Sequence, residues 1–183
     1  MFIEELFKDK SEFSEKVIKD IHSLILMDHR ENRGVYRRIP VMIMGAVHTP
    51  PLPYLVSVQM EQLIKDYTDN TSGHLIELIA KFHLDFETIH PFIDGNGRTG
   101  RLLLNLELMK NGYPTINIKY SDRRRYYNCF TSYHTNNDPT DMIMLVAENV
   151  EAEIKRYIDI VKMSNDVSDN TLYQEEINQE DEI

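Results

Sequence analysis

The sequence contains one cysteine and only seven glycines among its 183 residues. Because Cys129 has no cysteine partner in the chain, an internal disulfide and a cysteine-based metal site are both excluded. No apolar run approaches the ~20 residues that a membrane-spanning helix needs. The first residues, MFIEELFKDK, lack the basic-then-apolar order of a signal peptide. These absences predict a cytoplasmic protein without a membrane segment.

Basic residues are also in short supply, because 20 Lys and Arg stand against 30 Asp and Glu. Residues 164–183 contain seven acids and no base, so the 23 acids of the remaining chain nearly balance its 20 bases. A net acidic chain is not typical of proteins that bind nucleic acid or an anionic membrane, and we expect neither partner. The composition predicts one folded domain over residues 1–163 and an acidic tail over 164–183, either disordered or with one weak helix near 171–178.

The hydrophobic spacing predicts a mainly α fold. Ser14 is a candidate N-cap, Thr71 or Ser72 is another, and Gly112 is typical of a residue that follows a helix. The apolar, β-branched run IPVMIMGAV (39–47) is the best strand candidate, and we expect it to be one arm of a β-hairpin. The expected helices cover about residues 2–9, 14–27, 56–66, 71–88, 98–111, 120–133 and 140–163.

Three of the seven glycines fall within residues 95–100, in the stretch HPFIDGNGRTGR (90–101). An amphipathic helix is expected before this stretch, and a helix that is apolar nearly all round is expected after it. The stretch therefore lies at the N-terminus of a central helix, where free N–H groups and the positive end of the helix dipole attract anions.

The residue types in this stretch suit phosphate chemistry. Gly95 and Gly97 let phosphate oxygens approach the backbone, while Arg98 and Arg101, three apart on a helix, can hold a polyphosphate together. Asp94 is placed to bind Mg²⁺, which normally takes one or two carboxylates plus substrate phosphates. His90 is the side chain suited to proton transfer near neutral pH.

Other interpretations fit this stretch less well. The hexapeptide Gly95–Gly100 matches the GxGxxG of dinucleotide-binding folds, but that motif follows a strand and here a helix is expected before it. His83, Glu87 and His90 have a spacing that zinc ligands can use, although a histidine that orients the helix and a solvated glutamate are the plainer alternative. A tight helix–helix turn with its arginines paired to acids explains the glycines, but not the histidine, aspartate, asparagine and two arginines together.

The motif resembles the signature of the Fic family, His-x-Phe-x-Asp/Glu-Gly-Asn-Gly-Arg-x-x-Arg, at every specified position. The segment GVYRRIPVMIMGAVHTPP (34–51) is similar to the family's flap, a hairpin over the active site. The segment SDRRRYYNCF (121–130) is similar to the part that contributes paired tyrosines beside the nucleotide. The resemblance covers about residues 14–160 and implies a Fic-type helical bundle with a small β-hairpin flap.

The resemblance also implies an activity, the transfer of AMP from ATP to a Ser, Thr or Tyr hydroxyl of a target protein, including self-modification. In this assignment His90 is the general base, and Asp94 holds the Mg²⁺ or Mn²⁺ that bridges the α- and β-phosphates. A target peptide would add to the flap strand. The implied nucleotide-binding set is Asp94, Gly95, Asn96, Gly97, Arg98, Thr99, Gly100, Arg101, Tyr126 and Tyr127, with Val41, Met42, Ile43 and Met44 of the flap.

Two features depart from the family pattern. His134 stands where many members have an asparagine, and the inhibitory motif Ser/Thr-x-x-x-Glu-Gly/Asn is incomplete. Lys16 follows Glu15 in one partial match, and a second Glu follows Glu175 in the other. Three explanations stay open: an inhibitory segment outside this chain, inhibition by the tail, or a separate antitoxin-like chain. A homo-oligomer is a further partner that the sequence leaves open.

Alternatives to protein adenylylation also stay open. They are the transfer of a different phosphate group, the removal of AMP, and a non-catalytic nucleotide-binding regulatory role. Outside the motif we expect Cys129 to be a small core residue. Arg123–Arg125 either form a solvated face or contact the target protein.

Overall fold

The computed structural model describes residues 13–27, 30–70 and 72–180, with side chains through residue 164. Six α-helices form the described part: α2 (Glu15–Ile25), α3 (Pro53–Asp69), α4 (Leu75–Ile89), α5 (Asn96–Lys110), α6 (Arg123–Asn136) and α7 (Thr140–Glu180), with a short 3₁₀ helix η1 (Tyr120–Asp122) before α6. The predicted mainly α fold class is therefore confirmed. The helix expected at residues 2–9 lies outside the described residues.

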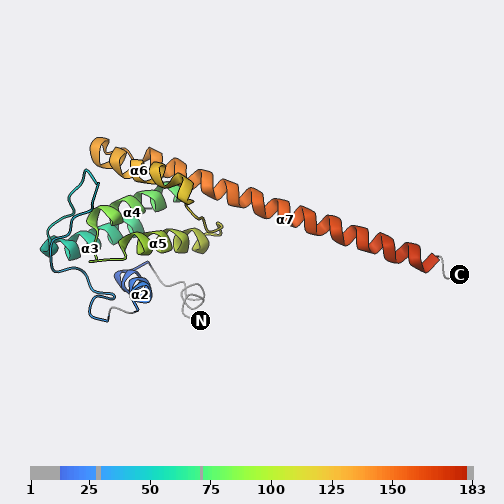
Figure 1. The fold of residues 1–183 in the computed structure, drawn as a ribbon, viewed down its shortest axis with the longest axis horizontal. Coiled ribbons are helices and arrows are strands. Elements are labelled where there is room, and N and C mark those ends of the chain that lie inside the picture. Colours follow the sequence, from blue (N-terminus) through green and yellow to red (C-terminus); the bar gives the residue numbers. More distant parts are fainter. Residues whose placement is uncertain (1–12, 28–29, 71, 181–183) are drawn as a thin grey trace.

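Helix α4 is at the centre of the bundle, because it contacts α3, α5 and α7. Figure 1 shows α2 on one side of the central helices and α6 with the first part of α7 on the other, while the rest of α7 extends far beyond the bundle. The sequence predicts an end of this last helix near residue 163, and the structure continues it to Glu180. No helix in the described ranges is long and apolar enough to cross a membrane.

Two apolar clusters hold the bundle together, and α4 and α5 contribute to both. Phe82, Phe86 and Leu103 belong to the cluster that also contains residues of α2 and α3. Leu84 and Leu104 belong to the cluster shared with α6 and α7. Both helices are therefore buried on two faces. The loop that joins them is anchored at each end by a tightly packed helix. The prediction that the helix after the motif is central is confirmed.

The helix starts follow local capping chemistry. Ser14 caps α2 as predicted, since its hydroxyl accepts the Val17 N–H. Helix α4 begins three or four residues later than the predicted start at Thr71 or Ser72. The imidazole of His74 accepts the Ile76 N–H and acts as the N-cap instead. Histidine is not among the preferred capping residues, and the sequence therefore predicted Thr71 or Ser72 as the cap.

The strand expected at residues 39–47 is absent, since the structure assigns no strand to residues 35–52. The segment runs as an extended loop with a turn in which the Ala46 N–H donates to the Ile43 carbonyl oxygen and Gly45 has a φ of 81°. Met42 and Met44 are 84% and 95% exposed. A strand requires a partner backbone, and the described part of the chain offers none. The β-hairpin is therefore not confirmed, and the apolar pattern reflects a loop over the domain surface.

Candidate active site

The loop between α4 and α5 is shaped by two left-handed residues and by its own side chains. His90 ends α4 with φ 50° and ψ 60°, and Gly95 precedes α5 with φ 81°. The Asn96 amide accepts the Phe92 N–H and donates to the Phe92 carbonyl oxygen, at 2.8 Å each. The Thr99 hydroxyl donates to the Gly95 carbonyl oxygen at 2.9 Å. The side chains of Asn96 and Thr99 are thus buried inside the loop and fix its shape.

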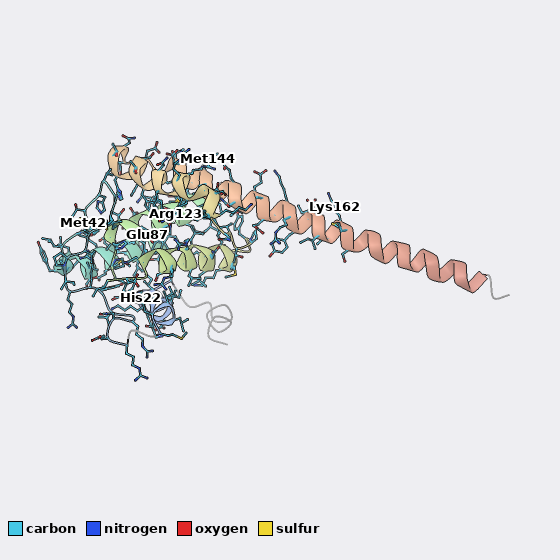
Figure 2. All side chains as sticks on the ribbon, in the orientation of Figure 1. His22, Met42, Glu87, Arg123, Met144 and Lys162 are labelled. Atoms are coloured by element: carbon cyan, nitrogen blue, oxygen red, sulfur yellow. The ribbon has the colours of Figure 1, made fainter. Side chains whose placement is uncertain are left out.

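His22 of α2, labelled in Figure 2, supports the same loop. Its Nδ1 accepts the Gly34 N–H at 2.8 Å, so its Nε2 carries the hydrogen and donates to the Asp94 carbonyl oxygen at 2.9 Å. The ring stacks on Phe92 with centroids 3.6 Å apart. Sequence reasoning missed this role. The available signal was a histidine within the apolar stripe of the first helix, where Ile18 and Ile21 are also buried.

A cavity of about 500 Å³ opens beside the loop. It is bounded by the ends of α4 and α5, by one face of α6, and by the loop segment 43–47. The tertiary structure therefore brings together four segments that lie far apart in the sequence. The polar side chains on its wall are Glu87, His90, Arg101, Arg123, Tyr126, Tyr127, Thr131 and His134.

The titratable groups on the wall, together with His83 buried behind them, lie close to one another. His90 Nδ1 lies 3.6 Å from Glu87 Oε2, and the Tyr126 hydroxyl lies 2.7 Å from His83 Nε2. Burial raises the pKa of Tyr126, so the phenol stays neutral, while the nearby Arg101 guanidinium interacts with its hydroxyl and opposes that rise. Three buried atoms in this set, Glu87 Oε1, His83 Nδ1 and His90 Nδ1, have no hydrogen-bond partner. The sequence analysis offered Glu87 as a zinc ligand or a solvated glutamate, and it did not foresee a place on the cavity wall beside His90.

Gly100 serves the packing of α4 against α5. A Cβ atom at this position would lie 2.6 Å from Glu87 Oε1 and 3.0 Å from the His83 ring. Gly97, by contrast, lines the cavity beside Arg101. The two glycines therefore have different roles: Gly97 leaves room on the cavity wall, and Gly100 lets the two central helices approach each other.

Asp94 and Arg98 face outward and pair with each other. Asp94 Oδ2 lies 3.3 Å from the Arg98 guanidinium, and the two side chains are 69% and 52% exposed. Asp94 Oδ1 accepts the Gly95 N–H at 2.6 Å. Arg98 does not line the cavity. It meets Arg101 at a neighbouring hollow of about 380 Å³. Of the two arginines predicted to act together, only Arg101 faces the cavity.

No cluster of three or more potential metal ligands exists in the described part of the chain. The zinc interpretation of His83, Glu87 and His90 therefore has no support. Asp94 offers a single solvent-facing carboxylate. That donor set fits Mg²⁺ or Mn²⁺ in the usual nucleotide-dependent way, with phosphates and waters as the other ligands.

The paired tyrosines of α6 differ in environment. Tyr126 is buried and faces His83, while Tyr127 is 53% exposed and lies under the Arg123 guanidinium, 5.4 Å from the ring centroid. Arg125 turns away and forms an ion pair with Glu148. Within the predicted Arg123–Arg125 face, the structure thus assigns Arg123 to the cavity wall and Arg125 to the exposed side of α6 and α7.

Cys129 is buried, as predicted. Its exposed fraction is 1%, and burial raises the pKa of its thiol to about 11. The thiol is therefore neutral near pH 7. A neutral, buried thiol is a poor nucleophile, and Cys129 acts as a small core residue.

His134, which stands where the Fic pattern has an asparagine, ties α6 to the end of α4. The Thr88 hydroxyl donates to the Leu84 carbonyl oxygen, so His134 Nε2 must donate to Thr88 Oγ1, at 2.8 Å. His48 Nε2 donates to the Thr88 carbonyl oxygen at 2.9 Å, and its ring stacks on His134 with centroids 4.2 Å apart. The two histidines hold one arm of the 39–51 segment against the cavity.

We predict that acid destabilises the fold through its buried histidines. Burial lowers the pKa of His22, His83 and His134 from the ordinary 6.5. The unfolded chain therefore binds more protons below pH 6.5, and the free energy of unfolding falls as the pH drops from about 7 to 5, by at most about 1.4 kcal/mol per pH unit for each group. Urea unfolding at several pH values measures this slope.

The test variant is His22→Gln, which removes a buried histidine and should therefore give a shallower pH slope than the wild type. Equal slopes for the wild type and His22→Gln would contradict the assignment for His22.

The fold and motif agree with comparisons to known proteins. Residues 12–108 match the model of the Fic/DOC family. A protein adenylyltransferase fic-1 from Caenorhabditis elegans is 33% identical over 165 residues, which cover 88% of this chain and 32% of that protein. The chain belongs to the Fic/DOC family. A protein adenylyltransferase Fic from Nematostella vectensis is 36% identical over 145 residues, covering 77% of this chain and 33% of that protein.

Solved structures of the family give the same arrangement of helices. A structure of Fic-1 from Caenorhabditis elegans superposes with a TM-score of 0.79 at 30% identity, over 89% of this chain and 49% of that chain. The chain spans about a third of the length of the curated Fic relatives that it matches. The resemblance stated from the motif at residues 90–101 is thereby confirmed.

Proposed function

We propose that this Fic domain is a protein adenylyltransferase. The observation that carries the proposal is that His90 and Arg101 share one cavity with the tyrosines of α6, beside the N-terminus of α5. A base, a cation and free backbone N–H groups are what an AMP-transfer site needs. The names of the curated relatives support the same activity.

In the proposed reaction, the hydroxyl oxygen of a Ser, Thr or Tyr residue attacks the α-phosphorus of ATP. A P–O bond forms as the bond from the α-phosphorus to the bridging oxygen breaks, and pyrophosphate leaves with the electron pair. His90 takes the hydroxyl proton. A hydrogen on its Nδ1 faces the Glu87 carboxylate 3.6 Å away, which leaves the lone pair of Nε2 to accept that proton.

The other residues bind and orient. Gly95 and Gly97, with the backbone of Asn96, would receive the phosphates, and Arg101 would hold the outer ones. Tyr127 and Arg123 would form the adenosine side of the cavity. Asp94 would hold Mg²⁺ or Mn²⁺, which neutralises phosphate charge when it is bound. Arg98, paired with Asp94, would help to hold that carboxylate in place.

Within the segment 34–51 that resembles the family's flap, we propose residues 39–51 as the flap itself. Ile43–Val47 line the cavity, and the exposed Met42 and Met44 offer apolar contacts to a target. We infer that a target chain pairs with Val41–Met44 as an added strand, since the free backbone of this segment can accept one. We further propose residues 1–163 as the Fic unit. Its cytoplasmic location and any oligomer or inhibitory partner stay predictions.

The test uses ATP labelled in either of two positions. With α-labelled ATP, the proposed enzyme transfers label to itself or to a protein in a candidate lysate, and it releases unlabelled pyrophosphate. With γ-labelled ATP, the label appears in pyrophosphate and not in protein. Protein labelling from γ-labelled ATP would instead establish a phosphate transferase. Tight ATP binding without labelling in either case would favour a nucleotide-binding regulatory module.

We predict that the C-terminal tail does not inhibit this site. Helix α7 runs away from the bundle through residues 164–180, and so away from Arg101, where an inhibitory glutamate would pair (Figure 1). Deleting residues 164–183, or changing Glu175→Gly, should therefore leave self-labelling from α-labelled ATP within about threefold of the full chain. Glu176→Gly is the matched control. A rise of about tenfold or more in the Glu175 variant alone would identify the tail as the inhibitor.

A further inference from the structure

Arg37 is a buried cation without a carboxylate partner. It precedes the proposed flap, its exposed fraction is 2%, and it is among the largest fully buried side chains. Within the described ranges it forms no ion pair. Its neighbour Arg38 is exposed. A charged group out of contact with water is costly unless hydrogen bonds compensate it. The contacts of Arg37 must therefore compensate the cost of burying its charge.

All the hydrogen bonds of the Arg37 guanidinium go to backbone carbonyl oxygens. Nε donates to His90 O at 2.8 Å, and Nη2 donates to Ile89 O at 3.3 Å. Nη1 donates to Ile39 O at 3.3 Å, and Nη2 also donates to Pro51 O at 2.6 Å. One planar group thus joins the two ends of the segment 39–51 to the last carbonyl groups of α4.

The end of α4 is suited to a cation. The last carbonyl groups of a helix lack partners within the helix, and they form the negative end of its dipole. The backbone N–H of Arg37 adds a bond to Pro91 O at 2.9 Å. Three successive carbonyl oxygens, those of Ile89, His90 and Pro91, are therefore held by one residue.

These carbonyl groups set the direction of the His90 side chain. His90 has a left-handed backbone with φ 50°, a conformation that a non-glycine residue keeps only when its surroundings hold it. The peptide groups on both sides of His90 are fixed by Arg37. The same guanidinium fixes where the segment 39–51 begins and ends, and residues 43–47 of that segment line the cavity.

We propose that Arg37 is a positioning residue that sets the distance between His90 and a target hydroxyl docked on the segment 39–51. It does not touch ATP or the target. It acts through the carbonyl oxygens of Ile89 and His90 on one side and those of Ile39 and Pro51 on the other. This inference rests on the proposed adenylyltransferase function.

The test separates ATP binding from transfer. Arg37→Lys keeps the charge but cannot reach four carbonyl oxygens in a plane, and Arg37→Gln removes the charge. Arg38→Gln is the matched control on the exposed neighbour. ATP affinity is measured by equilibrium dialysis with labelled ATP. The rate constant of self-labelling from α-labelled ATP is measured as a function of ATP concentration, and circular dichroism melting confirms folding.

We expect the maximal self-labelling rate of both Arg37 variants to fall by about 10²-fold, because a displacement of about 1 Å between reacting groups costs that much. The ATP concentration at half-maximal rate and the dialysis Kd should stay within about threefold of wild type. Arg38→Gln should match wild type in all three measurements. The selective loss of rate is the signature of positioning, since a purely structural defect lowers the melting temperature and leaves the rate per folded molecule unchanged.

Two outcomes overturn the inference. One is a folded Arg37→Gln or Arg37→Lys variant that self-labels within about threefold of wild type. The other is a loss of ATP affinity equal to the loss of rate, which would place Arg37 in nucleotide binding. If the Arg37→Gln variant does not fold, the Arg37→Lys variant provides the test of the inference. Absence of labelling by the wild-type chain would instead refute the proposed function. The ATP affinity of the wild-type chain distinguishes that failure from a failure of the inference about Arg37.

Discussion

Replacing His90 with asparagine should abolish AMP transfer and leave ATP binding intact. Loss of a general base typically lowers a rate by about 10²–10⁴-fold. Asparagine is the sharpest replacement, because it tolerates the left-handed backbone of position 90 better than other non-glycine residues do. The loop should therefore keep its shape. The measurements are self-labelling from α-labelled ATP and equilibrium dialysis of ATP.

A matched histidine change separates catalysis from fold. His48→Asn alters a histidine that contacts the same end of α4 through the Thr88 carbonyl oxygen but does not line the cavity. We expect its self-labelling rate to stay within about tenfold of wild type. Transfer by His90→Asn within about threefold of wild type would remove His90 from the role of base.

Transfer should also require a divalent cation held by Asp94. A bound cation typically contributes several kcal/mol to stabilising charge on phosphate oxygens, so chelation with excess EDTA should lower self-labelling by about 10²-fold or more. Asp94→Asn is the informative variant. Its carboxamide oxygen can still accept the Gly95 N–H, so the loop keeps that bond while the charge is lost. Added Mg²⁺ or Mn²⁺ should restore the wild type fully and the variant in part at best.

The control for charge is Asp159→Asn, which removes an exposed carboxylate from α7. It should show wild-type transfer and wild-type dependence on Mg²⁺. Full activity of the wild-type chain in excess EDTA would contradict a metal-assisted reaction. An Asp94→Asn variant with an unchanged Mg²⁺ titration would show that another group holds the cation.

Short-range patterns in the sequence determined much of this protein. The helices appear where a 3.6-residue apolar period exists, because burial of one face is what stabilises them. The motif at 90–101 indicated the family, since its chemistry depends on residues within one short continuous stretch of the chain. The burial of Cys129 was also predictable, because a free cysteine usually behaves as a small core residue. Those inferences need no knowledge of which segments meet.

One sequence pattern led to a prediction that the structure does not confirm, because the segment that carries it has no partner strand. The run at 39–47 has strand composition, but a strand exists only when another backbone pairs with it, and none does in residues 35–52. Arg98 and Arg101 are three apart on one helix, which predicts a shared face, and both line the hollow of about 380 Å³. The sequence did not show that Arg101 alone also reaches the cavity wall formed by α4 and α6, while Arg98 stands in the first turn beside Asp94.

Only the tertiary structure decided which residues support the site. His22 meets the Asp94 carbonyl group across 72 residues of sequence, and Arg37 meets the His90 carbonyl group across 53. Glu87 reaches the cavity because Gly100 lets α4 and α5 approach each other. Contacts with backbone carbonyl groups leave no residue pattern in the sequence, since every residue has a carbonyl group. The sequence by itself therefore determined the chemistry of the loop at 90–101, and the packing of distant helices decided its geometry.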